Sequence, residues 1–156
     1  MDSGRRKVLQ GSGGAAVLGL AMAAGLFKPG AAWAQSWNKA AFETKSLNDA
    51  VKAMGGATAV ESKEIAIQSP DIAENGAVVP FTISSKLPKT EQLAILVEKN
   101  PNILAASFNI PDGTEPQVNT RVKMGQTSNV IALVKADGKY YYTAKEVKVT
   151  LGGCGG

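Results

Sequence analysis

The 156-residue sequence contains no histidine, one cysteine and few aromatic residues. Without histidine, the chain lacks the commonest general base and the commonest transition-metal ligand, and it cannot form the hydrolytic triads that need an imidazole. A single cysteine excludes an internal disulfide and every zinc site built from cysteine alone. The composition therefore argues against a catalytic constellation or a metal centre, and it leaves the one thiol, Cys154, to be explained.

Outside the N-terminal segment, the chain has little excess of charge of either sign. The whole chain has 17 basic and 13 acidic residues, and residues 1–34 hold four of the basic and one of the acidic ones. The remaining 13 basic and 12 acidic residues give a net charge of +1. No cluster of Lys and Arg with interleaved aromatic residues remains, so a nucleic-acid partner is not expected.

The N-terminal segment has the layout of an export signal. Arg5-Arg6 precedes a weakly hydrophobic Gly/Ala-rich run over residues 11–27, and Ala32-Trp33-Ala34 has the small-x-small pattern of a signal-peptidase site. We predict a twin-arginine signal over residues 1–34, a mature chain that begins at Gln35 in the periplasm, and no membrane attachment after cleavage. The alternative is an uncleaved anchor, for which an apolar run of 17 residues is short.

One helix is predicted before the pattern of apolar residues changes. Ser46 and Asp49 form a variant of the capping box at the start of a helix over Leu47–Met54, and Gly55-Gly56 is its stop. Residues 37–42 are expected to form a first turn that packs beside it.

From Glu64 onwards, apolar residues recur with the period of two that is typical of strands. Asp137-Gly138 is the strongest hairpin signal, because a two-residue primed turn needs positive φ at both central positions. We predict an all-β fold over residues 35–151, an antiparallel immunoglobulin-like β-sandwich with one short N-terminal helix; an open barrel is the alternative. The seven predicted strands cover residues 64–68, 77–84, 93–98, 103–110, 118–124, 129–135 and 139–151.

The sequence ends with Gly152, Gly153, Cys154, Gly155 and Gly156. Glycine loses the most backbone entropy on ordering and has no side chain to bury, so a flexible arm is predicted over residues 152–156. Such an arm places the thiol up to about 10 Å beyond residue 151, where it can enter the active-site cleft of another protein. The alternative is an accidental thiol on a frayed tail, although an exposed thiol in an oxidising compartment invites unwanted dimers and oxidation.

Four features together resemble the SoxY family, the sulfur carrier subunits of periplasmic thiosulfate oxidation: the twin-arginine signal, Glu74–Pro80, Arg121–Met124 and the ending Val147–Gly156. The resemblance implies that Cys154 holds thiosulfate-derived intermediates covalently, that the carrier is not an enzyme, and that it has no cofactor. It implies a heterodimer with SoxZ, a second small β-sandwich subunit. Other implied partners are a c-type cytochrome that conjugates thiosulfate to the thiol, a sulfohydrolase that releases sulfate and, in some organisms, a sulfane dehydrogenase.

Two other functions fit parts of the sequence. A ubiquitin-like sulfur carrier would use a thiocarboxylate on Gly156, but the export signal and the β-sandwich pattern argue against it. An exported adhesion or assembly module would use Cys154 for an intermolecular disulfide.

The other notable residues are predicted to have structural roles. Tyr140, Tyr141 and Tyr142 should pack in the core and across strands, and Arg121 and Lys123 should face solvent. Met54 and Met124 should also lie in the core.

Overall fold

The computed structural model describes residues 38–150. The predicted signal, its cleavage site and the predicted arm lie outside this range, as do the domain boundaries at residues 34/35 and 151/152. The described residues form two helices, α3 (Lys39–Phe42) and α4 (Leu47–Ala53). They also form nine strands: β1 (Ala59–Glu61), β2 (Ile65–Gln68), β3 (Ile72–Ala73), β4 (Val79–Ser85), β5 (Thr90–Val97), β6 (Leu104–Asn109), β7 (Gln117–Val122), β8 (Ser128–Ala136) and β9 (Lys139–Val149).

Helix α4 begins and ends as its sequence predicts. The Ser46 hydroxyl accepts a hydrogen bond from the Asp49 N–H at 3.1 Å and donates one to the Asp49 carboxylate at 2.6 Å. Gly55 has a φ of +90°, the left-handed conformation that ends a helix at little cost for glycine. The predicted first turn is helix α3. Within residues 38–150, no helix is long and apolar enough to cross a membrane.

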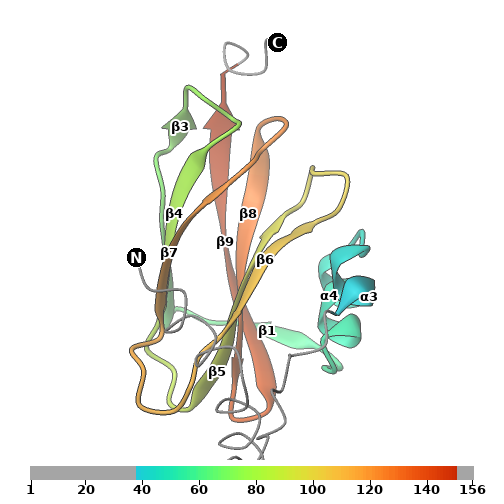
Figure 1. Ribbon diagram of the computed structural model, residues 1–156, viewed down its shortest axis with the longest axis vertical. Coiled ribbons are helices and arrows are strands. Elements are labelled where there is room, and N and C mark those ends of the chain that lie inside the picture. The colour runs from blue at the N-terminus through green and yellow to red at the C-terminus, as the bar shows by residue number, and fades with distance from the viewer. Residues whose placement is uncertain (1–37, 151–156) are drawn as a thin grey trace, which may run out of the picture. The chain divides into compact units, whose positions relative to one another are not determined.

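The strands form two sheets. The larger sheet has six strands in the order β1-β9-β8-β5-β6, with β3 also paired to β9, and the smaller has the order β2-β4-β7. Figure 1 shows both helices beside the larger sheet, away from β4 and β7. Contacts among the apolar side chains of α4 (Ala50 and Val51) and of the larger sheet (Leu96, Ile131 and Leu133) fix the helices on that face.

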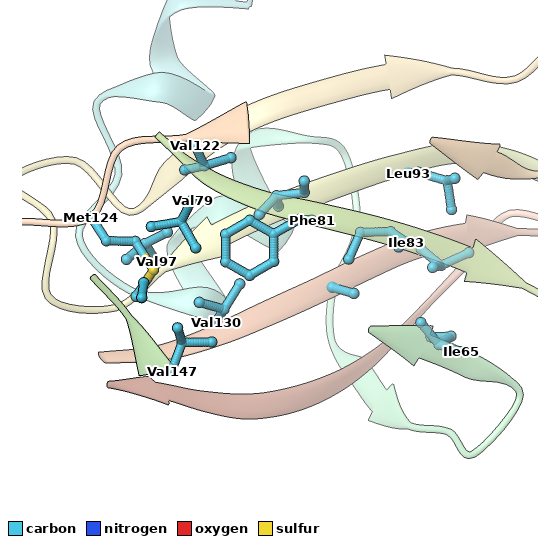
Figure 2. Close-up of a cluster of buried hydrophobic side chains, with 14 of the residues drawn as sticks. Ile65, Val79, Phe81, Ile83, Leu93, Val97, Val122, Met124, Val130 and Val147 are labelled. Atoms are coloured by element: carbon cyan, nitrogen blue, oxygen red, sulfur yellow. The ribbon is translucent and has the colours of Figure 1, made fainter. Parts of the chain in front are cut away.

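The main core lies between the two sheets. Figure 2 shows the Phe81 ring at the centre of this cluster, with Met124 and Val147 toward one end and Ile65 and Leu93 toward the other. The strand residues in this cluster come from alternate positions, as expected where each strand has one face on the core. The immunoglobulin-like β-sandwich predicted from the sequence is therefore confirmed, and each of the seven predicted strands is present.

Two strands were not predicted, and both pair parallel to β9 rather than antiparallel. Ala59–Glu61 aligns with 140–142, and Ile72–Ala73 aligns with 148–149. These strands have three and two residues, which is too short to show a period. Their larger side chains are also exposed, Val60 by 60% and Ile72 by 57%, so hydrophobic pattern gives no indication of pairing.

The β8–β9 hairpin is the turn that the sequence indicates most clearly. Asp137 and Gly138 have φ values of +49° and +72°, as a primed two-residue turn requires. The tyrosines that follow pack as predicted: Tyr140 is buried beneath the helices, Tyr141 contacts the core between the sheets, and Tyr142 packs against the helix side. The Tyr140 hydroxyl also donates a hydrogen bond of 2.6 Å to the Met54 carbonyl at the end of α4.

Tyr140→Phe is expected to destabilise the protein by about 1 kcal/mol, because the partly buried Met54 carbonyl loses its donor. Tyr141→Phe, which changes the neighbouring half-buried ring, is the matched control and should cost less than about 0.5 kcal/mol. Urea unfolding of both variants measures the difference. Equal losses for the two variants would show that the bond to Met54 adds nothing.

Candidate functional site at the end of the last strand

The predicted site residues, Cys154 and the four glycines around it, lie outside the described residues. The last described residue is Thr150, four positions before the cysteine. For this site, the structure therefore describes the part of the fold from which the segment with Cys154 continues. This part consists of the end of β9 and the loops around it.

One edge of the β9 end is held by β3. The Lys148 N–H donates a hydrogen bond to the Asp71 carbonyl at 2.9 Å, and the Thr150 N–H donates one to the Ala73 carbonyl at 3.1 Å. Figure 1 shows β3 alongside the end of β9. The backbone is thus paired as far as Thr150.

The other edge is held by β8 and by one side chain. Strand β8 begins at Ser128, which lies opposite Val147. Two residues further along β9, the Val149 N–H donates to the Thr127 hydroxyl at 3.0 Å. The amides of residues 148, 149 and 150 therefore bond alternately to the two sides of the strand.

Gly76 packs closely against this end. Its carbonyl accepts a hydrogen bond of 2.7 Å from the Met124 N–H. A Cβ atom on Gly76 would lie 2.5 Å from the Met124 carbonyl oxygen and 2.8 Å from Val149 Cγ1. The two internal stretches that resembled the SoxY family, Glu74–Pro80 and Arg121–Met124, therefore meet beside the last residues of β9.

Asn100 connects two further loops at the same end. Its side-chain amide donates to the Lys123 carbonyl at 2.8 Å, and its carbonyl oxygen accepts from the Gly125 N–H at 3.2 Å. The Lys99 N–H also donates to the Ser128 hydroxyl at 3.0 Å. Sequence analysis did not single out Asn100 or Thr127: an Asn-Pro dipeptide such as Asn100-Pro101 is typical of a turn, and no motif marks Thr127.

A single ion pair anchors the segment that leads into β3. Lys145 Nζ lies 2.9 Å from the Asp71 carboxylate and donates to the Ser69 carbonyl at 2.8 Å. The hydrogen bond from Lys145, together with its charge, lowers the pKa of Asp71 below the ordinary value of 3.8. Arg121 and Lys123 are exposed, as the alternation predicted.

The described contacts at this end of the fold position the backbone of β9. Among residues 38–150, no group of three or more His, Cys, Asp or Glu side chains could hold a metal ion. Backbone amides, hydroxyls and one amide side chain hold the end of β9 in place. They fix where the segment with Cys154 begins.

Gly76→Ala is expected to destabilise the fold by about 1–3 kcal/mol, because its Cβ must displace Met124 or Val149. Gly125→Ala is the matched control: a Cβ there meets nothing within 4 Å, and its cost should stay below about 0.5 kcal/mol. Thermal and urea unfolding of both variants measure this. If Gly76→Ala proved as stable as Gly125→Ala, the close packing at this end would be disproved.

The Asp71–Lys145 pair predicts a pH dependence. Because folding lowers the pKa of Asp71, the pair stabilises the folded state fully above the ordinary value of 3.8, and this contribution is lost as the pH falls through the lowered value. Asp71→Asn should therefore be less stable than the parent at neutral pH, and the difference should disappear in strong acid. Urea midpoints across this range measure it, with Glu74→Gln as a control for loss of one carboxylate on the other side of β3. A difference that persists unchanged into acid would contradict the assignment.

Comparisons with known proteins show a family and solved structures that this chain resembles. The family described as SoxY, sulfur oxidation protein SoxY, matches residues 50–154, a range that reaches Cys154. Among solved structures, the sulfur carrier protein SoxY from Chlorobium limicola f thiosulfatophilum is 39% identical, with a TM-score of 0.61 over 67% of this chain and 96% of that chain.

A second solved structure is similar in fold alone. Superoxide reductase (neelaredoxin) from Ignicoccus hospitalis is 16% identical, with a TM-score of 0.50 over 55% of this chain and 80% of that chain. No match was found among curated proteins. Because the SoxY match covers well over half of the sequence and the Chlorobium protein shares 39% identity, the chain belongs to the SoxY family of sulfur oxidation proteins.

Proposed function

We propose that this protein is a sulfur carrier that holds thiosulfate-derived intermediates covalently on Cys154 and presents them to the enzymes of sulfur oxidation. The observation that carries the proposal is the family match, which extends to Cys154, the one cysteine in the sequence. The solved SoxY from Chlorobium limicola f thiosulfatophilum is itself a sulfur carrier protein. In this proposal the chain is the substrate of other enzymes and is not a catalyst.

The proposed chemistry needs one sulfur nucleophile and an external oxidant. Joining the Cys154 thiolate to the outer sulfur of thiosulfate forms a sulfur–sulfur bond and releases two electrons, which a c-type cytochrome accepts. A sulfohydrolase then adds water, releases sulfate and leaves a persulfide on Cys154. A sulfane dehydrogenase would then oxidise the outer sulfur of the persulfide with three water molecules, passing six electrons to a cytochrome acceptor and forming a sulfonate that the sulfohydrolase can cleave. No cofactor bound to this chain takes part in these steps.

The visited enzyme must activate the thiol. An ordinary cysteine has a pKa of about 8.5, so only a small fraction is thiolate near neutral pH. Residues 149–156 contain no charged side chain, and the nearest in sequence, Lys148, is six positions away and paired through its backbone to β3. Coupling to thiosulfate also needs the electron acceptor, and a largely protonated thiol reacts slowly with oxidants in free solution, which protects it between visits.

The proposal extends to a partner and a compartment. We propose a heterodimer with a SoxZ-like subunit, in a periplasmic location reached by the twin-arginine signal at Arg5-Arg6. The twin-arginine route exports folded proteins, and this sequence has no metal or haem motif that would require folding before export. Co-export of a companion subunit without its own signal gives a reason for that route.

Cys154→Ser is expected to abolish thiosulfate-dependent cytochrome reduction in a reconstituted pathway, because serine keeps the shape and loses the sulfur nucleophile. The unfolding free energy should change by less than about 0.5 kcal/mol. As a control, the double variant Thr150→Cys/Cys154→Ser restores a thiol at an exposed position at the end of the fold, where it should not recover activity. Turnover by Cys154→Ser would refute the carrier role.

Intact mass spectrometry of the native protein tests the same proposal without a variant. We expect sulfur or thiosulfate adducts that map to Cys154. A sulfur at the carboxyl group of Gly156 would indicate the ubiquitin-like chemistry instead. A simple disulfide dimer with no adduct would indicate the adhesion or assembly module.

A further inference from the structure

Strand β9 extends past the point where its pairing with β8 stops. Ser128, the first residue of β8, lies opposite Val147, whereas β9 continues to Val149. One edge of this extension pairs with β3 through the backbone. On the other edge, within the described residues, the contact is made by a side chain that takes the place of a strand: Thr127 Oγ1 lies 3.0 Å from Val149 N and 3.5 Å from Val149 O.

We infer that Thr127 is a positioning residue for the segment that carries Cys154, an inference that rests on the proposed carrier function. Val149 is half-buried, and its side chain packs against the core between the sheets. Removing the Thr127 hydroxyl would leave the Val149 N–H without its acceptor. A partly buried amide in that state is stabilised by moving into water, so the end of β9 would open from the fold more often, against the bonds of Lys148 and Thr150 to the β3 side.

Separation would change the reach of the thiol. Cys154 follows Thr150 by four residues, which span at most about 14 Å, but it follows Val147 by seven, which span up to about 25 Å. A longer tether lowers the effective concentration of the thiol at a target by roughly twofold, by the −3/2 power of its length. By holding Val149, the Thr127 hydroxyl thus keeps the tether to Cys154 at its shorter length, which starts at Thr150 rather than at Val147.

Amide hydrogen exchange tests the contact directly on the purified protein. Thr127→Val has the same shape without the hydroxyl, and it should speed exchange at Val149 about fivefold, whereas Thr127→Ser keeps the hydroxyl and should match the parent. Exchange at Ile83 and Leu133, which are buried in the two cores, should be unchanged in both variants. Thr127→Ala provides a second hydroxyl-free variant if Thr127→Val folds poorly.

The effect on transfer is measured with thiosulfate as substrate in a reconstituted assay. The KM for the carrier should rise in Thr127→Val by up to about twofold, the value for complete opening, with kcat unchanged because the chemistry of the docked thiol is the same. General loss of structure would instead speed exchange at Ile83 and Leu133 as well.

Three results would overturn the inference: unchanged exchange at Val149, faster exchange with an unchanged KM, or Thr127→Ser behaving like Thr127→Val. The exchange measurement does not depend on carrier chemistry. Turnover by Cys154→Ser would therefore remove the proposed function and leave the hydrogen bond at Val149 tested separately.

Discussion

The pairing of β8 with β9 is the interaction on which the rest of the structure depends. The two strands align over nine residue pairs, from Ser128 with Val147 to Ala136 with Lys139. Alternate residues of β9 serve different cores, so that Val147 faces the smaller sheet and Tyr140 faces the helices. A shift of one residue in this register would exchange these two faces and disrupt both cores together.

The two short parallel strands also depend on β9. Both short parallel strands, β1 and β3, have β9 as their neighbour, and each is too short to be stable alone. The loops at one end also converge on it, through Gly76 beside Val149 and through Thr127. Backbone pairing, one hydroxyl and close packing at a glycine thereby hold the point from which the chain continues toward Cys154.

The elements predicted correctly are those whose signals are local. Ser46 and Asp49 mark a helix start by their own hydrogen bonds, and Asp137-Gly138 specifies a hairpin through its backbone preference. The short strands around Val60 and Ile72 could not be predicted, because their pairing depends on a strand roughly 75 residues or more away in sequence and their side chains are exposed. For the site, sequence alone indicates the thiol. The contacts of Thr127 and Asn100 exist only once loops distant in sequence have met.

The length of β9 separates two regions of the molecule. Eleven residues at about 3.4 Å each span about 37 Å, from the hairpin at Asp137-Gly138 to the residues beside β3. A molecule that contacts only the hairpin end therefore leaves the opposite end, where the chain continues toward Cys154, open to an enzyme. Under the proposed carrier function, binding of a partner at the hairpin end would not exclude loading of Cys154 at the other end.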